Sequence, residues 1–212
     1  MPVGGSQLRL FIRQPFTETS EREAAIVQGV LDVLHQLDGA PYQFQFLTGH
    51  QAQSSETFRL EFERETGQEF TPINFRKNRL ERLDCADAMV VIRTGLSEST
   101  AFELAYNIFG GPSAPIFFAI WDQAPIKTTL LRGLNEIVTA RYVTFSNPKE
   151  LMGPLRDFFR MCAKGKGVPT RNACPSRAAL RGNGRKTSGR ANIMTAAPPR
   201  LPARKVTMAI DE

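Results

Sequence analysis

The chain has 212 residues and a formal net charge of +6, which at first suggests a nucleic-acid-binding protein. The charge is unevenly divided: residues 1–162 hold 16 Lys and Arg against 19 Asp and Glu, a net −3, and residues 163–212 hold 11 against 2, a net +9. The composition therefore excludes a strongly basic folded domain. It predicts one α/β domain over residues 1–162 and a basic tail over residues 163–212.

The first third of the chain alternates between strand and helix patterns. Residues 8–12 form an apolar run typical of a strand. Ser20 and Glu23 then have the spacing of a capping box, and the apolar stripe of the helix they open continues to Leu37. Residues 42–47 alternate aromatic and polar side chains, which predicts a second strand.

The middle of the chain contains the most informative stretch. Residues 49–67 are polar and fit either a short charged helix or a mobile lid. A helix from Pro72 leads into residues 88–92, an apolar run rich in β-branched side chains that predicts a strand covered on both faces. The following helix carries three aromatic residues at helical spacing that are predicted to face the sheet: Phe102, Tyr106 and Phe109.

The alternation continues to about residue 162. A strand is predicted at 115–121, a helix at 126–137, a short strand at 141–145 and a closing helix at 148–161. Strand followed by helix, repeated about five times, predicts a doubly wound, mainly parallel five-stranded sheet of the flavodoxin or Rossmann kind. Beyond residue 162, Gly, Pro, Ser, Arg and Lys dominate, so we expect a disordered tail that either contacts polyanions or has no specific role.

Glu103 is the central candidate for chemistry. It follows a buried strand and falls near the start of a helix, whose partial positive charge favours an ionised carboxylate. Ser97, Ser99 and Thr100 precede it and could hold an anionic or hydroxyl-rich ligand at the edge where open α/β sheets bind ligands. The alternative is a surface glutamate that only stabilises a helix start.

Three other charged residues near this stretch, Asp87, Arg79 and Arg93, are candidates for the same site. Asp87, at the entrance of the strand, fits a catalytic role and a loop hydrogen bond equally well. Arg79 and Arg93 could add positive charge to a ligand site. No His, Cys and Asp cluster has metal-ligand spacing, and neither GxGxxG nor GxxxxGK[ST] occurs, so we predict no metal and no cofactor.

The segments LFIRQPF, ADAMVVI and GLSESTAFELAYN together resemble the nucleoside 2-deoxyribosyltransferase superfamily, which includes nucleoside 5′-monophosphate N-glycosidases. The resemblance covers roughly residues 8–160. It implies that Glu103 is the nucleophile at the sugar C1′ and that Ser97, six residues earlier, contacts the 5′-phosphate. It also implies that the first-strand loop lines the nucleobase pocket with Arg13, Gln14, Pro15 and Phe16.

Three positions depart from the pattern of that superfamily. Arg79 stands where an acidic residue is frequent, Gln14 stands where glycine usually precedes the proline, and Ala105 stands where glycine is commoner. The expected activity is cleavage of the N-glycosidic bond of a nucleoside or nucleoside 5′-monophosphate, by hydrolysis or base exchange. Two alternatives stay open: a catalytically silent nucleotide sensor, which Arg79 favours, and an NAD-cleaving glycohydrolase similar to Toll/interleukin-receptor-like domains.

Cysteine usage and hydropathy give the expected location and partners. The three cysteines form no CxxC pair and are too scattered for a disulfide scaffold. The chain has no signal-peptide pattern at its start and no run of about 18 apolar residues. We expect a cytoplasmic protein that binds a small nucleoside or nucleotide, could form a homodimer and has no membrane partner.

Overall fold

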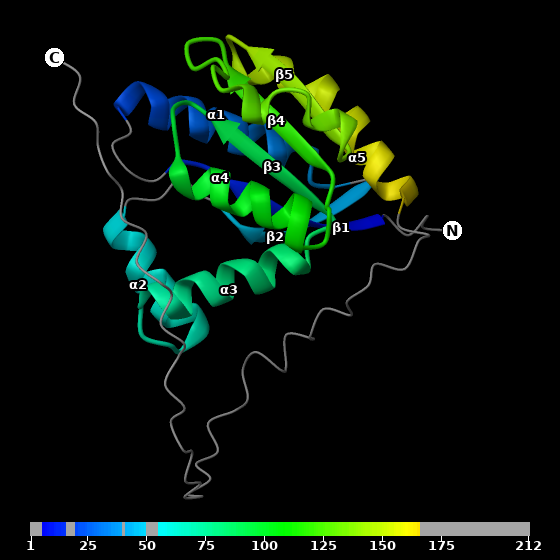
Figure 1. Ribbon diagram of the computed structural model, residues 1–212. Helices are drawn as coiled ribbons and strands as arrows, with labels where there is room; N and C mark the ends of the chain where they lie inside the picture. Colours follow the sequence, from blue (N-terminus) through cyan, green and yellow to red (C-terminus); the bar gives the residue numbers. More distant parts are fainter. Residues whose placement is uncertain (1–5, 16–19, 40, 50–54, 166–212) are drawn as a thin grey trace, which may run out of the picture. The chain divides into compact units, whose positions relative to one another are not determined.

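The computed structural model describes residues 6–15, 20–39, 41–49 and 55–165 (Figure 1). Within them, five strands form one sheet in the order β2-β1-β3-β4-β5, and every neighbouring pair is parallel. The strands are β1 (Ser6–Arg13), β2 (Tyr42–Thr48), β3 (Ala88–Arg93), β4 (Ile116–Trp121) and β5 (Ala140–Phe145). This is the strand order of flavodoxin-like doubly wound folds, so the predicted fold class is confirmed.

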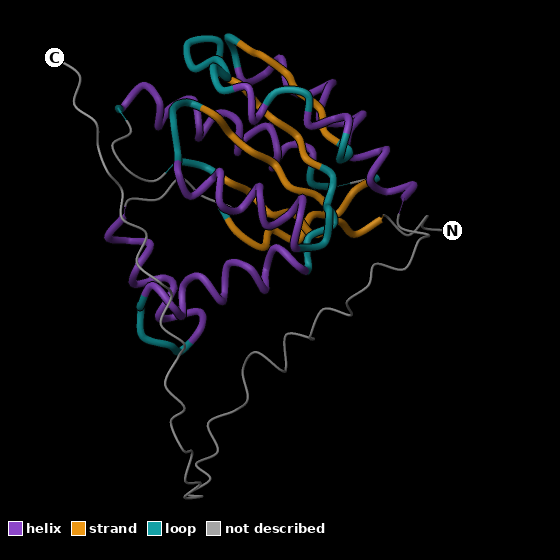
Figure 2. Tube along the Cα trace, in the orientation of Figure 1, coloured by secondary structure: helices purple, strands orange, loops and turns teal. Residues whose placement is uncertain are grey.

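Helices cover both faces of the sheet (Figures 1 and 2). α1 (Glu21–Leu37) and α5 (Met152–Gly165) pack on one face. α3 (Pro72–Asp84) and α4 (Glu98–Ala105) pack on the other. α2 (Ser55–Thr66) lies against α3 through a cluster of phenylalanines, outside both main cores. The predicted short charged helix is therefore confirmed over Ser55–Thr66, and residues 50–54 of the segment lie outside the described residues.

The central strands are buried because helices cover both of their faces. β4 is buried at every position, and β3 at every position except Arg93. Their side chains alternate between the two cores, with Val90 packing toward α1 and α5 and Val91 toward α3 and α4. Continuous apolar runs are the expected pattern for such strands.

Two helix predictions made from capping and periodicity are confirmed. The side chain of Ser20 accepts a hydrogen bond from the backbone N–H of Glu23, whose carboxylate in turn accepts from the backbone N–H of Ser20. The predicted closing helix is α5, which follows a single 3₁₀ turn at Pro148–Leu151 and buries Leu155, Phe158 and Phe159 in the core.

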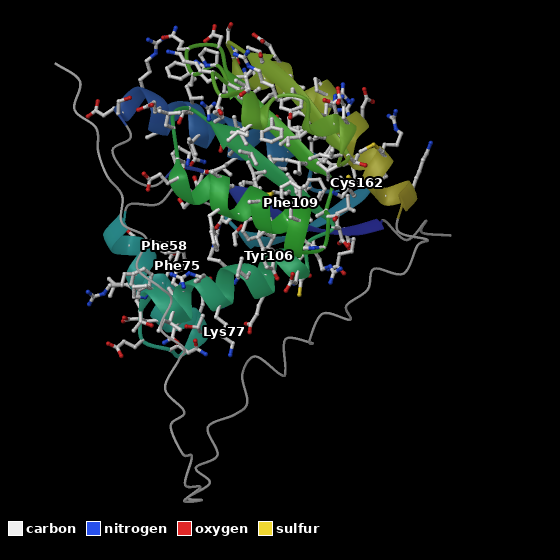
Figure 3. All side chains as sticks on the ribbon, in the orientation of Figure 1. Phe58, Phe75, Lys77, Tyr106, Phe109 and Cys162 are labelled. Atoms are coloured by element: carbon white, nitrogen blue, oxygen red, sulfur yellow. The ribbon has the colours of Figure 1, made fainter. Side chains whose placement is uncertain are left out.

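The predicted inward face of α4 is wrong for Phe102 and Phe109 and confirmed for Tyr106, which is half-buried against the core. Phe102 and Phe109 are 52% and 79% exposed, and Figure 3 labels Phe109 on this helical segment. Glu103, Leu104 and Asn107 are buried instead. The spacing of the aromatic residues predicted a helix correctly, but it did not predict which side of the helix faces the sheet. Two polar residues, Glu103 and Asn107, occupy inward positions that the periodicity assigned to phenylalanines.

Asn107 can be buried because its amide is paired on both sides. Its Nδ2 donates to the carbonyl of Ala114 at 2.9 Å, and its Oδ1 accepts from the backbone N–H of Ala114 at 3.0 Å. Here the helix changes into a π-helical turn, Tyr106–Gly110, and the Tyr106 hydroxyl donates to the carboxylate of Asp84. The pairing replaces the water that Asn107 loses on burial.

The helix predicted at residues 126–137 is absent. Two 3₁₀ turns, Thr129–Leu131 and Leu134–Glu136, take its place. Gly133 adopts a left-handed backbone with φ of 69° between them, and Leu130 is 83% exposed. A helix here would have gained little from burial of an apolar stripe, which is the main source of helix stability in proteins.

The predicted basic tail lies almost entirely outside the described residues. Of residues 163–212, the structure describes only 163–165, which form the end of α5. The tail and its boundary at residue 162 stay predictions.

Candidate active site

The candidate active site lies at the carboxyl edge of the sheet, where β1 and β3 end as neighbours. Arg13 is the last residue of β1. After β3 the chain turns into α4, where the Ser97 hydroxyl caps the helix by accepting from the backbone N–H of Thr100. Glu103 lies within α4 on the side facing the sheet and is only 5% exposed. These elements converge at the edge where doubly wound sheets bind ligands.

Two arginines hold the carboxylate of Glu103. Arg79 Nε, from α3, donates to Glu103 Oε1 at 2.9 Å. Arg13 Nε lies 3.3 Å from Glu103 Oε2, and all three side chains are buried. Removing one partner from a buried ion pair leaves an uncompensated charge, which costs about 3 to 5 kcal/mol. The three side chains, called the Arg–Glu–Arg cluster below, therefore form an interdependent unit.

Arg13 also contacts the hydroxyl groups of Ser97, Ser99 and Thr100, which the sequence analysis expected to hold a ligand. Its guanidinium donates to Thr100 Oγ1 and Ser97 Oγ at 3.0 Å each, and it makes a short contact with Ser99 Oγ. A further nitrogen donates to the carbonyl of Gln14 at 2.8 Å. The structure thus brings the predicted residues together, with Arg13 at their centre.

The Arg–Glu–Arg cluster carries an excess of positive charge. Two guanidinium groups face one carboxylate, which leaves a formal charge of +1. Burial lowers the pKa of Arg13 from 12.5 to about 10, Glu103 opposes that shift and the charge of Arg79 adds to it. Arg13 still stays protonated near neutral pH. A cluster of this sign attracts anions.

Arg79 combines ionic and aromatic contacts. Its guanidinium carbon lies 4.4 Å from the ring centre of Phe11 and 6.0 Å from that of Phe75. Within the described part of the chain, its Nη2 is buried without a hydrogen-bond partner, as is the hydroxyl of Thr94. A buried donor that lacks a partner costs about 1 to 3 kcal/mol. Arg79 Nη2 is therefore a point at which a ligand or water acceptor would be stabilising.

Asp87 is not part of the site. It precedes β3, and its carboxylate accepts from the backbone N–H of Arg9 at 2.7 Å and from the Arg9 guanidinium at 3.0 and 3.1 Å. Six residues of strand, about 20 Å at 3.3 Å per residue, separate Asp87 from the carboxyl end of β3 at Arg93. The structure therefore supports the loop hydrogen-bond interpretation of Asp87.

The remaining predicted residues border the cluster. Arg93 donates to the carbonyls of Ala124 and Pro125 and so holds the loop after β4, and burial lowers its pKa. Gln14 is buried, and Pro15 lines a hollow beside Arg93. Phe16 lies outside the described residues.

Two hollows flank the Arg–Glu–Arg cluster. The first lies between the end of β2, α2 and α3, and its volume of about 440 Å³ includes space open to solvent. Arg79, Asn78, Phe58 and Phe75 are among its lining residues. The second, of about 320 Å³ including open space, is lined by residues of the first-strand loop and the start of α4, Ser97 among them. Neither Glu103 nor Arg13 lines either hollow.

The aromatic side of the first hollow was not identified from the sequence as part of a site. Phe58, Phe62, Phe70 and Phe75 contact one another with ring centres 5.3 to 6.1 Å apart. Figure 3 shows Phe58 and Phe75 side by side where α2 meets α3. The spacing of four residues between Phe58 and Phe62 is compatible with a helix. It does not indicate which other helix that helix packs against.

Neither metal ligation nor a membrane span is indicated in the part of the chain that the structure covers. No group of three or more His, Cys, Asp and Glu residues there lies close enough to hold a metal ion. None of the helices in those ranges has the length and hydrophobicity needed to cross a bilayer.

Comparisons with known proteins extend the description of the fold. No family model and no curated protein sequence matches the chain. Among solved structures, the chain is similar to the CMP N-glycosidase BcmB of Clostridium botulinum, with 14% identity and a TM-score of 0.47 over 71% of this chain and 98% of that one. It is also similar to a 2-deoxyribosyltransferase of Bacillus psychrosaccharolyticus, with 18% identity and a TM-score of 0.41 over 68% of this chain and 90% of that one.

At identities of 14% and 18%, neither structure assigns a role to any residue of this chain.

Proposed function

We propose that the carboxyl edge of the sheet binds a nucleoside or nucleoside 5′-monophosphate and that Glu103 acts on its N-glycosidic bond. One observation carries the proposal. The residues that the sequence singled out, from β1, α3 and α4, converge on Arg13 and Glu103. A carboxylate for the sugar and an anion-attracting group beside it are the two elements that a nucleotide N-glycosidase needs.

The reaction would proceed through the carboxylate. A Glu103 oxygen forms a bond to C1′ as the C1′–N bond breaks, and the base leaves with a proton taken from solvent or a nearby donor. Water then attacks C1′, which releases the sugar and restores the carboxylate, or a second base attacks and completes an exchange. Because Glu103 is buried and paired with Arg13 and Arg79, at least one arginine has to move before the carboxylate reaches a sugar.

A second candidate is nucleotide binding without cleavage. It is favoured by the two guanidinium groups beside Glu103: Arg79 donates a hydrogen bond to Oε1, and Arg13 lies at ion-pair distance from Oε2, which accepts no hydrogen bond within the described residues. The transition state of glycosidic cleavage carries positive charge at the sugar. A cluster with a formal charge of +1 stabilises such a cation less well than an isolated carboxylate does, whereas it binds a phosphate well.

A base-release assay separates these candidates. The full-length protein is incubated with nucleosides, their 5′-monophosphates and NAD, and freed bases are measured by chromatography. Release by the wild type, lost by orders of magnitude in Glu103→Asp, supports the enzyme, since the shorter side chain keeps the charge and withdraws it from C1′. The control is Glu98→Gln, an exposed carboxylate of the same helix, which should keep wild-type turnover.

Nucleotide binding without base release would favour the silent module. Neither binding nor release for any member of the panel would overturn both candidates. Release of nicotinamide alone would identify the third class, an NAD-cleaving enzyme.

We also propose that the chain forms a homodimer and that its basic tail contacts polyanions. Phe102 and Phe109 give α4 an exposed apolar face that self-association could bury. Light scattering of the wild type and of a Phe102→Ser, Phe109→Ser double variant tests the first point. A purely monomeric wild type would refute it. Truncation after Lys166 tests the second: salt-sensitive binding to polyanions should be lost, and equal binding by the shortened chain would refute it.

A further inference from the structure

We propose that the hollow between α2 and α3, in place of the first-strand loop that the resemblance implied, is the subsite for the planar ring of the ligand, and that Arg79 selects rings carrying an oxo group. This inference rests on the proposed function, since it names the chemical class of ligand that the same edge of the sheet takes. Three observations carry it: a buried donor without a partner, an aromatic wall and an open hollow at the same place.

The donor is Arg79 Nη2. The side chain lines the hollow, is only 5% exposed and is fixed at Nε by Glu103 and at its face by Phe11. Nη2 has no acceptor among the described residues. A guanidinium cannot give up its proton, so Nη2 gains the missing interaction only when an acceptor reaches it. The carbonyl oxygen of a heterocycle is such an acceptor.

The aromatic wall is made by Phe58 of α2 and Phe75 of α3. Their rings are half-buried and perpendicular, with centres 5.3 Å apart, so part of each borders the hollow. A flat ring lying in the hollow would contact the face of one phenylalanine ring and the edge of the other. Aromatic groups favour stacked and edge-to-face contacts of this kind. Glu61 and Glu65 also line the hollow, so an amino group on the ring would have carboxylates near it.

The combination favours cytosine, uracil and guanine over adenine, because adenine has no oxo group to accept from Arg79. A base with both an oxo and an amino group, such as cytosine or guanine, matches the arginine and the glutamates together. The expected preference for oxo-bearing over adenine nucleotides is about tenfold, the ratio that one hydrogen bond to a charged donor produces.

The test is calorimetric titration of the full chain with CMP, UMP, GMP and AMP. The wild type should bind the three oxo-bearing nucleotides about tenfold more tightly than AMP. Arg79→Met should abolish the difference, and Arg79→Lys, which keeps charge with fewer donors, should reduce it. The control is Lys77→Met, an exposed charge on the same helix with 71% of its side chain exposed, which should leave the preference unchanged (Figure 3).

The outcomes separate this inference from the function on which it rests. Binding of all four nucleotides with equal affinity by the wild type would overturn the oxo selection and leave the proposed function standing. An equal loss for all four in both Arg79 variants would identify a structural role alone and would also overturn it. No binding of any nucleotide would overturn the proposed function itself. A preference that survives Arg79→Met with the fold intact would show that another group selects the ring.

Discussion

Replacing Glu103 by glutamine should destabilise the fold, and the reason lies in the Arg–Glu–Arg cluster. The substitution keeps the volume of the side chain and removes its charge. Arg13 and Arg79 would then face each other's charge with side chains 5% and 6% exposed and no carboxylate between them. Breaking a buried ion pair in this way costs about 3 to 5 kcal/mol. At roughly 2 to 4 °C per kcal/mol for a domain of this size, Tm should fall by about 6 to 20 °C.

The measurement is thermal unfolding followed by circular dichroism, with Glu98→Gln as the control. Glu98 is exposed on the same helix, so its variant should melt with the wild type. Adding Arg79→Met to Glu103→Gln should recover part of the loss, because it removes one of the two uncompensated charges. A Glu103→Gln protein that melts within about 2 °C of the wild type would refute the structural coupling of the cluster.

Three further predictions follow from other parts of the structure. In denaturant titrations at concentrations low enough to keep the chain monomeric, Leu104→Ala should cost about 2 to 5 kcal/mol and Phe102→Ser less than about 0.5 kcal/mol, and the reverse order would restore the inward face predicted from the sequence. Asp87→Asn should cost about 1 to 3 kcal/mol by removing the carboxylate that binds Arg9, while nucleotide affinity stays at the wild-type value; a weakened affinity would place Asp87 in the site. Burial raises the pKa of Cys162 to about 12, so at pH 8 its thiolate fraction is about a thousandth of that of an ordinary thiol, and mass spectrometry should find this residue unmodified by thiol reagents until denaturant is added.

The raised pKa of Cys162 also predicts how the stability of the fold depends on pH. Because the folded pKa lies above the ordinary value of 9.0, the folded chain keeps a proton that the unfolded chain loses. The contribution of Cys162 to stability is therefore complete below pH 9 and falls as the pH rises toward 12. Cys162→Ala should flatten this alkaline part of the stability curve.

The fold was predictable because its signals are local. The apolar runs of β3 and β4, the capping box at Ser20 and the apolar face of α5 each depend on residues close together in the sequence. Where prediction failed, long-range pairing decided the outcome. Asn107 and Glu103 turn inward because Ala114 and two arginines from other elements meet them, and no pattern within α4 carries that information.

The sequence indicated several residues that lie close together, and it did not indicate how they contact one another. The sequence singled out Arg13, Glu103 and the hydroxyl residues before it, and these do converge. It treated Arg79 as a departure that could add charge, whereas the structure pairs Arg79 directly with Glu103. The aromatic hollow was missed because its wall joins two helices whose contact depends on how α2 folds back on α3.

The most direct test of the proposed function is a crystal structure of the full chain with a non-cleavable nucleoside 5′-monophosphate analogue. The proposal predicts the sugar C1′ within about 3 to 3.5 Å of a Glu103 oxygen, the distance of a group poised to react. It also predicts the phosphate near Arg13 and the ring in the hollow between α2 and α3. A ligand bound elsewhere, or a Glu103 carboxylate still enclosed by both arginines with the sugar out of reach, would contradict a role for Glu103 in bond cleavage.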